Sequence, residues 1–162
     1  MTAPCRDHAG FTLVELVAAL AIFAVLATVA VSPLRIERQR AQERELRAAL
    51  REIRDALDAY KRMVDEKRIP PVSADASGYP PSLDALAQGI ALEGRPPGSR
   101  IYLLRRIPRD PFHPDPDTPA AATWGLRSSA SPPERPQAGA DVFDVHSRSP
   151  GVGLNGVPYR EW

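Results

Sequence analysis

The stretch "FTLVELVAALAIFAVLATVAV", from Phe11 to Val31, decides how this chain is organised. Among its 21 residues only Thr12, Glu15 and Thr28 are polar. As a helix rising about 1.5 Å per residue it would be roughly 31 Å long, close to the thickness of the hydrocarbon core of a bilayer. A cleavable secretory signal has a shorter apolar core, and a buried core helix would need a larger remainder of the chain to enclose it. The stretch therefore predicts a membrane-spanning helix.

Length and composition limit what surrounds this helix. The 162 residues allow one modest domain plus an appendage, and the formal net charge of +1 gives no basic excess for binding nucleic acid. Almost all of the 18 prolines and 10 glycines come after Ile69, so the chain is regular first and rich in loops afterwards. The single cysteine, Cys5, excludes a disulfide within the chain.

Glu15 is a carboxylate inside the apolar stretch. A charge at the centre of a membrane helix costs about 2.5–3.5 kcal/mol on insertion scales, and less near an end. One interpretation is that Glu15 lies at the membrane interface and extends toward water. The other is that it has a partner. Cleavage between Gly10 and Phe11 would create an α-amine at Phe11, one helical turn away, which would neutralise Glu15 of its own chain or of a neighbour.

The string "GFTLVEL", from Gly10 to Leu16, resembles the type III signal sequence of type IV pilins and type II secretion pseudopilins. The resemblance implies that a prepilin peptidase cuts after Gly10 and methylates the new N-terminal residue, Phe11. It also implies that Glu15 guides assembly of subunits into a filament. Pro33 falls where the family tends to have a helix-kinking proline.

The helix is expected to continue over residues 35–68, which contain no glycine or proline and include 19 charged residues. Pairs such as Glu43 and Arg47 have the i,i+4 spacing of surface ion pairs. Pro70 and Pro71 are expected to end the helix. Apolar residues recur at alternating steps of four and three, which draws one stripe along a helix: Leu46, Leu50, Ile53, Leu57, Tyr60 and Val64. A homodimeric coiled coil would explain the stripe, but a helix docked on a small sheet is favoured because a domain follows it.

The C-terminal part predicts a short helix and two strands. "YPPSLDAL", Tyr79–Leu86, indicates a turn and a short helix with Ser82 as its N-cap. "TWGLRS", Thr123–Ser128, and "DVFDVHS", Asp141–Ser147, read as strands joined by the Pro/Ser-rich segment Ser129–Gly139. The order of these motifs is similar to that of the major (G-type) pseudopilin of type II secretion.

The predicted fold class is α+β, with a long N-terminal helix, its first half transmembrane, packed on a small antiparallel sheet head with long loops. Residues 1–10 are expected to be a cleaved leader, 11–34 the transmembrane and assembly helix, 35–68 its amphipathic continuation and 69–162 the globular head.

No catalytic constellation emerges from the sequence. His113, Asp115 and Asp117 lie among alternating prolines, which favours a solvated loop over a metal site. Asp144 and His146 share one face of a predicted strand, yet no serine or cysteine nucleophile can be assigned beside them. The sequence therefore predicts that this chain is not an enzyme.

The resemblance implies a structural subunit of a periplasmic pseudopilus, anchored by a single pass in the bacterial inner membrane with its head in the periplasm. Its expected partners are copies of itself, other pseudopilins, the prepilin peptidase, the inner-membrane secretion platform and membrane lipid, with no nucleic acid. A type IV pilin-like filament subunit and a non-polymerising, single-pass anchored binding protein are the alternatives. Arginines directly after the span would place that side in the cytoplasm by the positive-inside rule, in conflict with the resemblance: Arg35, Arg38, Arg40 and Arg44.

Major G-type pseudopilins hold calcium in the loop after the second strand, so the resemblance raises the question of a metal. Calcium takes six to eight oxygen ligands. The matching tail, Ser147–Trp162, offers only Asn155 and Glu161 as strong side-chain ligands. We therefore expect no cofactor, and a tail held by the packing of three side chains: Leu154, Tyr159 and Trp162.

Overall fold

The first element of the fold is one long helix, α1 (Leu13–Asp65), of 53 residues. The computed structural model describes residues 12–71, 77–96 and 98–162, and the side chains of residues 26–34 also lie outside that description. The chain divides into two compact units, residues 1–39 and 40–162, and α1 supplies residues to both. The helix continues through Pro33 without a break. Its residues are mostly Ala, Leu, Arg and Glu, which have high helix propensity.

The helix α1 ends at Asp65, three residues before the expected end at Arg68. Lys67 has a φ of 55°, in the left-handed region. The N–H of Lys67 bonds to the carbonyl of Val64, and the N–H of Arg68 bonds to the carbonyl of Met63, both at 2.9 Å. This pair of bonds is a Schellman turn, which satisfies the last helical carbonyls before the two prolines are reached.

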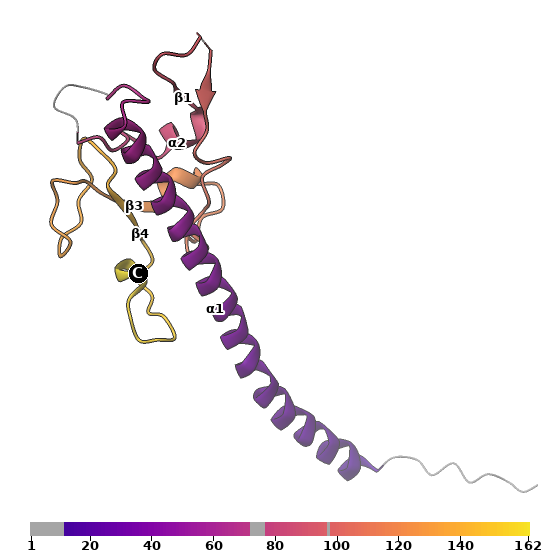
Figure 1. Cartoon of the computed structure of the whole chain (residues 1–162). Helices are drawn as coiled ribbons and strands as arrows, with labels where there is room; N and C mark the ends of the chain where they lie inside the picture. Colours follow the sequence, from indigo (N-terminus) through magenta and orange to yellow (C-terminus); the bar gives the residue numbers. More distant parts are fainter. Residues whose placement is uncertain (1–11, 72–76, 97) are drawn as a thin grey trace, which may run out of the picture. The chain divides into compact units, whose positions relative to one another are not determined.

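After α1, the described chain consists of two small antiparallel sheets and short helical turns joined by long loops (Figure 1). The elements follow in this order: α2 (Asp84–Gln88), β1 (Ile90–Ala91), β2 (Arg100–Ile101), the 3-10 turn η1 (Ala120–Thr123), β3 (Trp124–Arg127), β4 (Asp144–Ser147) and the 3-10 turn η2 (Tyr159–Glu161). Strand β1 pairs with β2, and β3 pairs with β4. The two strands predicted from alternation are therefore confirmed, with Leu126 opposite Val145. The β1–β2 hairpin was not predicted.

The predicted N-cap of the short helix, Ser82, is wrong. The cap position of α2 is Leu83, and no side chain caps it by a hydrogen bond. Leu83 already has helical φ and ψ of −62° and −32°, and both Leu83 and Leu86 are almost fully buried. Burial of these two leucines thus holds α2 in place, because about 1.5–3 kcal/mol per buried leucine exceeds what a cap contributes.

The core lies between the C-terminal half of α1 and the head, and the strands β3 and β4 run alongside that half of the helix (Figure 1). Five of the six stripe residues are buried, and Val64 packs against them partly buried. From the head, core side chains include Leu83, Leu104, Trp124 and Val145. The stripe is therefore covered by the chain's own head, which confirms the α+β class and the docked helix.

The predicted membrane span, residues 11–34, lies partly outside the described residues. Phe11 is not described, nor are the side chains of residues 26–34. Where the structure does describe the chain, it contains no helix whose length and apolarity would suffice to cross a membrane.

Candidate functional site

The first turn of α1 is built around Thr12. Its hydroxyl oxygen accepts a hydrogen bond from the Glu15 N–H at 3.2 Å, and its carbonyl accepts one from the Leu16 N–H at 3.1 Å. Thr12 is thus the N-cap, with Glu15 three residues later, which is the sequence pattern of a capping box. An acidic side chain in the first turn also interacts favourably with the helix dipole, by about 0.3–1 kcal/mol. The pattern Thr-x-x-Glu was visible in the sequence, but its capping meaning was missed.

The other predicted residues of this site are not described. Gly10 and Phe11, the expected cleavage and methylation residues, lie outside the described residues. Glu15 is described, and its side chain is exposed. The structure therefore places Glu15 in the first turn of α1, whose N-cap is Thr12.

Large apolar side chains are exposed along the described first part of α1. Leu13 is 79 % exposed, Val14 75 % and Phe23 69 %. A contiguous run of this kind on a protein surface marks a region that is covered by lipid or by another protein. The N-terminal part of α1 thus offers an apolar surface in addition to the Glu15 carboxylate.

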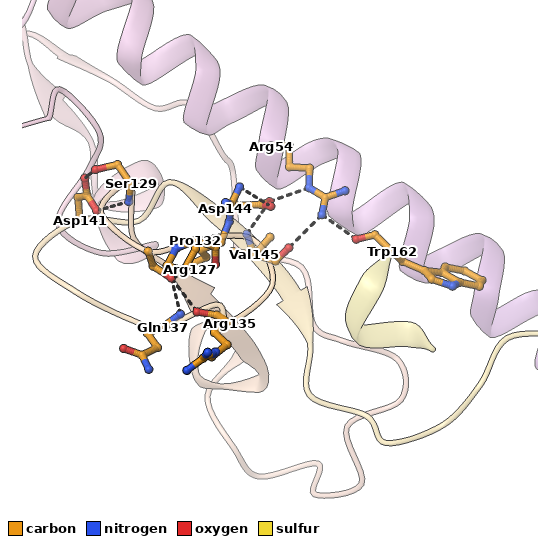
Figure 2. A network of polar contacts seen from close by, with 11 residues as sticks. Arg54, Arg127, Ser129, Pro132, Arg135, Gln137, Asp141, Asp144, Val145 and Trp162 are labelled. Carbon is orange, nitrogen blue, oxygen red and sulfur yellow. Dashed lines mark hydrogen bonds and ion pairs between the residues drawn. The ribbon is translucent and has the colours of Figure 1, made fainter. Parts of the chain in front are cut away.

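In the head, Arg54 of α1 reaches two segments that are distant in sequence (Figure 2). Its Nε donates to Asp144 Oδ1 at 2.8 Å, and its Nη2 donates to the carbonyls of Val145 at 3.1 Å and of Trp162 at 2.7 Å. Arg127 of β3 pairs with the other Asp144 oxygen at 3.5 Å. One guanidinium therefore holds the helix, the strand β4 and the C-terminal residue together.

Glu43 is a buried carboxylate, only 5 % exposed. Its Oε1 accepts hydrogen bonds from the Leu154 N–H at 2.8 Å and from the Tyr159 hydroxyl at 3.1 Å. Arg47 lies 4.0 Å from the other oxygen. The expected surface pair of Glu43 with Arg47 is therefore a minor part of an internal contact with the tail, because the helix turns Glu43 toward the head.

The end of the chain packs through aromatic rings. Tyr159 stacks on Phe112 with ring centroids 4.1 Å apart and meets Trp162 edge-on at 5.1 Å. Arg47 lies over the Trp162 ring at 4.2 Å. Tyr159 and Trp162 thus pack as expected, whereas Leu154 is 47 % exposed and contributes its backbone N–H instead of its side chain.

Asp141 closes the loop between β3 and β4 at its base (Figure 2). Its carboxylate accepts hydrogen bonds from the hydroxyls of Ser128 and Ser129 and from the Ser129 N–H. Burial raises the pKa of this carboxyl, but these bonds and one from Ser77 outweigh it and lower the pKa to about 2.

Comparison with known proteins shows what the chain resembles. Residues 5–31 match the family model of the prokaryotic N-terminal methylation motif. Two proteins named type II secretion system core protein G, from Klebsiella michiganensis and Klebsiella pneumoniae, are each 29 % identical to it. The matches cover 111 and 110 residues, which are 66 % and 65 % of this chain and 70 % of each relative. The chain thus carries this motif and is similar to core protein G of type II secretion systems. No solved structure matches the chain.

Asp144 and His146 were weighed for catalysis, and the structure does not place the serine next to them in β4, Ser147, for a reaction with His146. Ser147 is buried and donates its hydroxyl to Asp110 Oδ2 at 2.5 Å. His146, its neighbour in β4, points to the opposite face and packs against Gly125, and burial lowers its pKa. A serine and histidine on opposite faces of a strand are not placed for proton transfer between them.

The loop at Asp110–Asp117 is likewise structural. Asp115 accepts bonds from the Thr118 hydroxyl and the Asp117 N–H, and the Thr118 bond lowers its pKa. His113 donates its backbone N–H to the carbonyl of Asp110. These bonds shape a turn. The support for a structural role and against an enzymatic one comes from the relatives, which are core proteins of a secretion system.

Proposed function

We propose that this chain is a pseudopilin which, after losing residues 1–10, assembles into a periplasmic pseudopilus of a type II protein secretion system. The observation that supports this most directly is the match of residues 5–31 to the methylation motif, in a segment where Glu15 follows the N-cap and apolar side chains are exposed. The two relatives are named as core proteins of a type II secretion system, which supports a role in the same kind of system.

The proposed mechanism uses the charge of Glu15 and the apolar surface together. Cleavage after Gly10 leaves an amine on Phe11, four residues before Glu15 in the sequence. An amine and a carboxylate that are both unpaired in a low-dielectric surrounding are costly, whereas the pair is tolerated. An incoming subunit is therefore drawn to the position where its Glu15 meets the Phe11 amine of a neighbour, and the apolar helices then pack against one another.

The proposal includes the processing enzyme and the location. A prepilin peptidase acts from the cytoplasmic side, residues 11–34 cross the inner membrane, and the head lies in the periplasm. Membrane lipid, other pseudopilins and the inner-membrane platform are the remaining partners. The arginines after residue 34 oppose this orientation by the positive-inside rule. The cleavage motif supports it, because the motif must face a peptidase on the cytoplasmic side.

The first test is the intact mass of the membrane-extracted protein. The mature chain should begin at Phe11 and carry one methyl group. Gly10→Val should leave a full-length precursor, because the peptidase needs close access to a bond that follows a residue without a side chain. A mature mass from this variant would count against the type III signal at Gly10. A retained leader in the unchanged protein would favour the non-polymerising anchor.

The second test separates assembly from insertion. Glu15→Leu removes a charge and should insert into membranes at least as well as the unchanged protein, while its cross-linked multimers should fall at least tenfold, about 1.4 kcal/mol. Glu15→Gln is the variant matched to glutamate in size. It should also form few multimers, because it too lacks the charge. Multimers at the normal level from either variant would show that Glu15 only lies at the interface.

A further inference from the structure

The loop after β4 is the place where the resemblance to G-type pseudopilins implies calcium. This loop is the tail, Ser147–Trp162. Its only carboxylate and amide side chains are Glu161 and Asn155. The Asn155 Oδ1 already accepts the Val157 N–H at 3.1 Å, and Glu161 lies 3.7 Å from the guanidinium of Arg160. No group of three His, Cys, Asp or Glu side chains in the described ranges is placed to hold a metal ion.

Three backbone oxygens in the middle of the tail are also engaged with protein donors. Gly151 and Gly153 accept bonds from the N–H groups of Tyr159 and Gly156. The Val157 carbonyl accepts both the Gly153 N–H at 2.9 Å and the Trp162 indole N–H at 3.2 Å. Calcium needs six to eight oxygens that converge on one point. These oxygens instead face N–H groups of the same loop, so the residues present do not fit the ion.

The polarity inside the tail is the reverse of that in a cation site. The groups that converge there are donors, the Leu154 N–H and the Tyr159 O–H, and both meet Glu43 Oε1. A cation at this point would face the positive ends of two dipoles, whereas a carboxylate satisfies both. Hydrogen bonds to a charged acceptor are also roughly twice as strong as neutral ones.

We propose that Glu43 of α1 organises the tail in place of a metal ion, with Arg54 as the second charged anchor, and that the head of this chain folds without calcium. Glu43 gathers the middle of the tail, and Arg54 holds its end through the Trp162 carbonyl at 2.7 Å. Both anchors come from α1, so the tail is fixed directly to the helix. The proposal holds whether or not the chain polymerises.

The test compares the full chain, purified in detergent, in EDTA and in millimolar calcium. The melting temperature of the unchanged protein should be the same in both, since a ligand that binds only the native state would raise it. Hydrogen exchange followed by mass spectrometry then reports on the tail directly. In Glu43→Ala, peptides that include Leu154 should exchange roughly tenfold faster, because a donor at the helix–tail contact loses its acceptor.

Two further variants make the result specific. Glu43→Gln keeps an oxygen acceptor without the charge, so its tail should exchange at an intermediate rate. Glu45→Ala, at an exposed position on the same helix, should leave tail exchange unchanged. If Glu43→Ala does not fold, Glu43→Gln and the calcium comparison still decide.

Two results would overturn the proposal. The first is a rise of several degrees in the melting temperature of the unchanged protein with calcium. The second is normal tail exchange in the folded Glu43 variants. Neither result would affect the cleavage after Gly10 or the assembly role of Glu15, so failure of this proposal is distinguishable from failure of the proposed function.

Discussion

At the scale of single residues, two glutamates of α1 show how surroundings assign a role to one chemical group. Glu15 is exposed in the capped first turn, next to apolar side chains. Glu43 is buried and accepts two hydrogen bonds from the tail. The first carboxylate is open to a partner from outside, whereas the second already has its partners within the head.

Asp141 leads to a prediction about acid stability. Its folded pKa of about 2 lies below the value of about 3.9 in an unfolded chain. The native state therefore favours the ionised form, and the stabilisation is complete above about pH 4 and is lost as the pH falls toward 2. Asp141→Asn should lower stability at neutral pH and flatten its decline between about pH 4 and pH 2, measured by urea unfolding at a series of pH values.

The control for this prediction is Asp117→Asn, which changes an exposed aspartate in another loop. Its curve of stability against pH should follow that of the unchanged protein. An equally steep acid decline in Asp141→Asn would mean that the bonds from Ser128 and Ser129 do not stabilise the ionised carboxylate in the folded state.

At the scale of elements, α1 is one helix with two kinds of surface. Its described first part exposes large apolar side chains on more than one face, whereas the part within residues 40–65 buries a single stripe. A helix that is apolar all round needs an apolar surrounding, and a helix with one stripe needs only one covering layer. The head supplies that layer for the second part and is not required by the first.

The stripe leads to a prediction about packing. Ile53 is 0 % exposed in the centre of the core. Ile53→Ala should lower the free energy of unfolding by about 2–5 kcal/mol, because it removes buried methyl groups and leaves a cavity. Chemical denaturation of the full chain measures this loss. Glu52→Ala changes the exposed neighbour and should stay within about 0.5 kcal/mol. A loss below about 1 kcal/mol in Ile53→Ala would contradict the docking of α1 on the head.

At the scale of the whole molecule, the head is closed by contacts between segments far apart in the chain. Arg54 bonds to residues 90, 91 and 108 positions away. Glu43 bonds to residues 111 and 116 positions away. The described sheets have only two strands each, so side-chain bonds from α1 contribute to holding the loop-rich part of the chain together.

Arg54 leads to a prediction about this closure. Arg54→Ala should cost about 2–3 kcal/mol of unfolding free energy, since three acceptors lose a charged donor while remaining partly open to water. Arg54→Lys should recover only part of this, because an ammonium does not reproduce the planar set of donors. Thermal unfolding of the two variants checks the order. Arg160→Ala, at a side chain 70 % exposed, should be nearly neutral. Equal stability of the Lys variant and the unchanged protein would reduce Arg54 to a simple charge.

The features that the sequence predicted are those with a local signature. Each of them can be recognised from residues that are close together in the sequence: the apolar stretch, the motif at Gly10–Leu16, the stripe from Leu46 to Val64, and the strands β3 and β4. The end of α1 at Asp65 was harder to predict from the sequence. The prolines at 70 and 71 set only the last residue at which the helix could end, and the Schellman turn at Lys67 ends it earlier.

By itself, the sequence determined a long helix with an apolar first part, a stripe that needs a cover, and two antiparallel strands, because local periodicity is enough to specify each of them. Only the tertiary structure decided which charges face inward. Glu43 and Glu45 are the same residue two positions apart, yet Glu43 is 5 % exposed and Glu45 is exposed. The difference arises because the tail, more than 100 residues later, folds back and places two hydrogen-bond donors against Glu43.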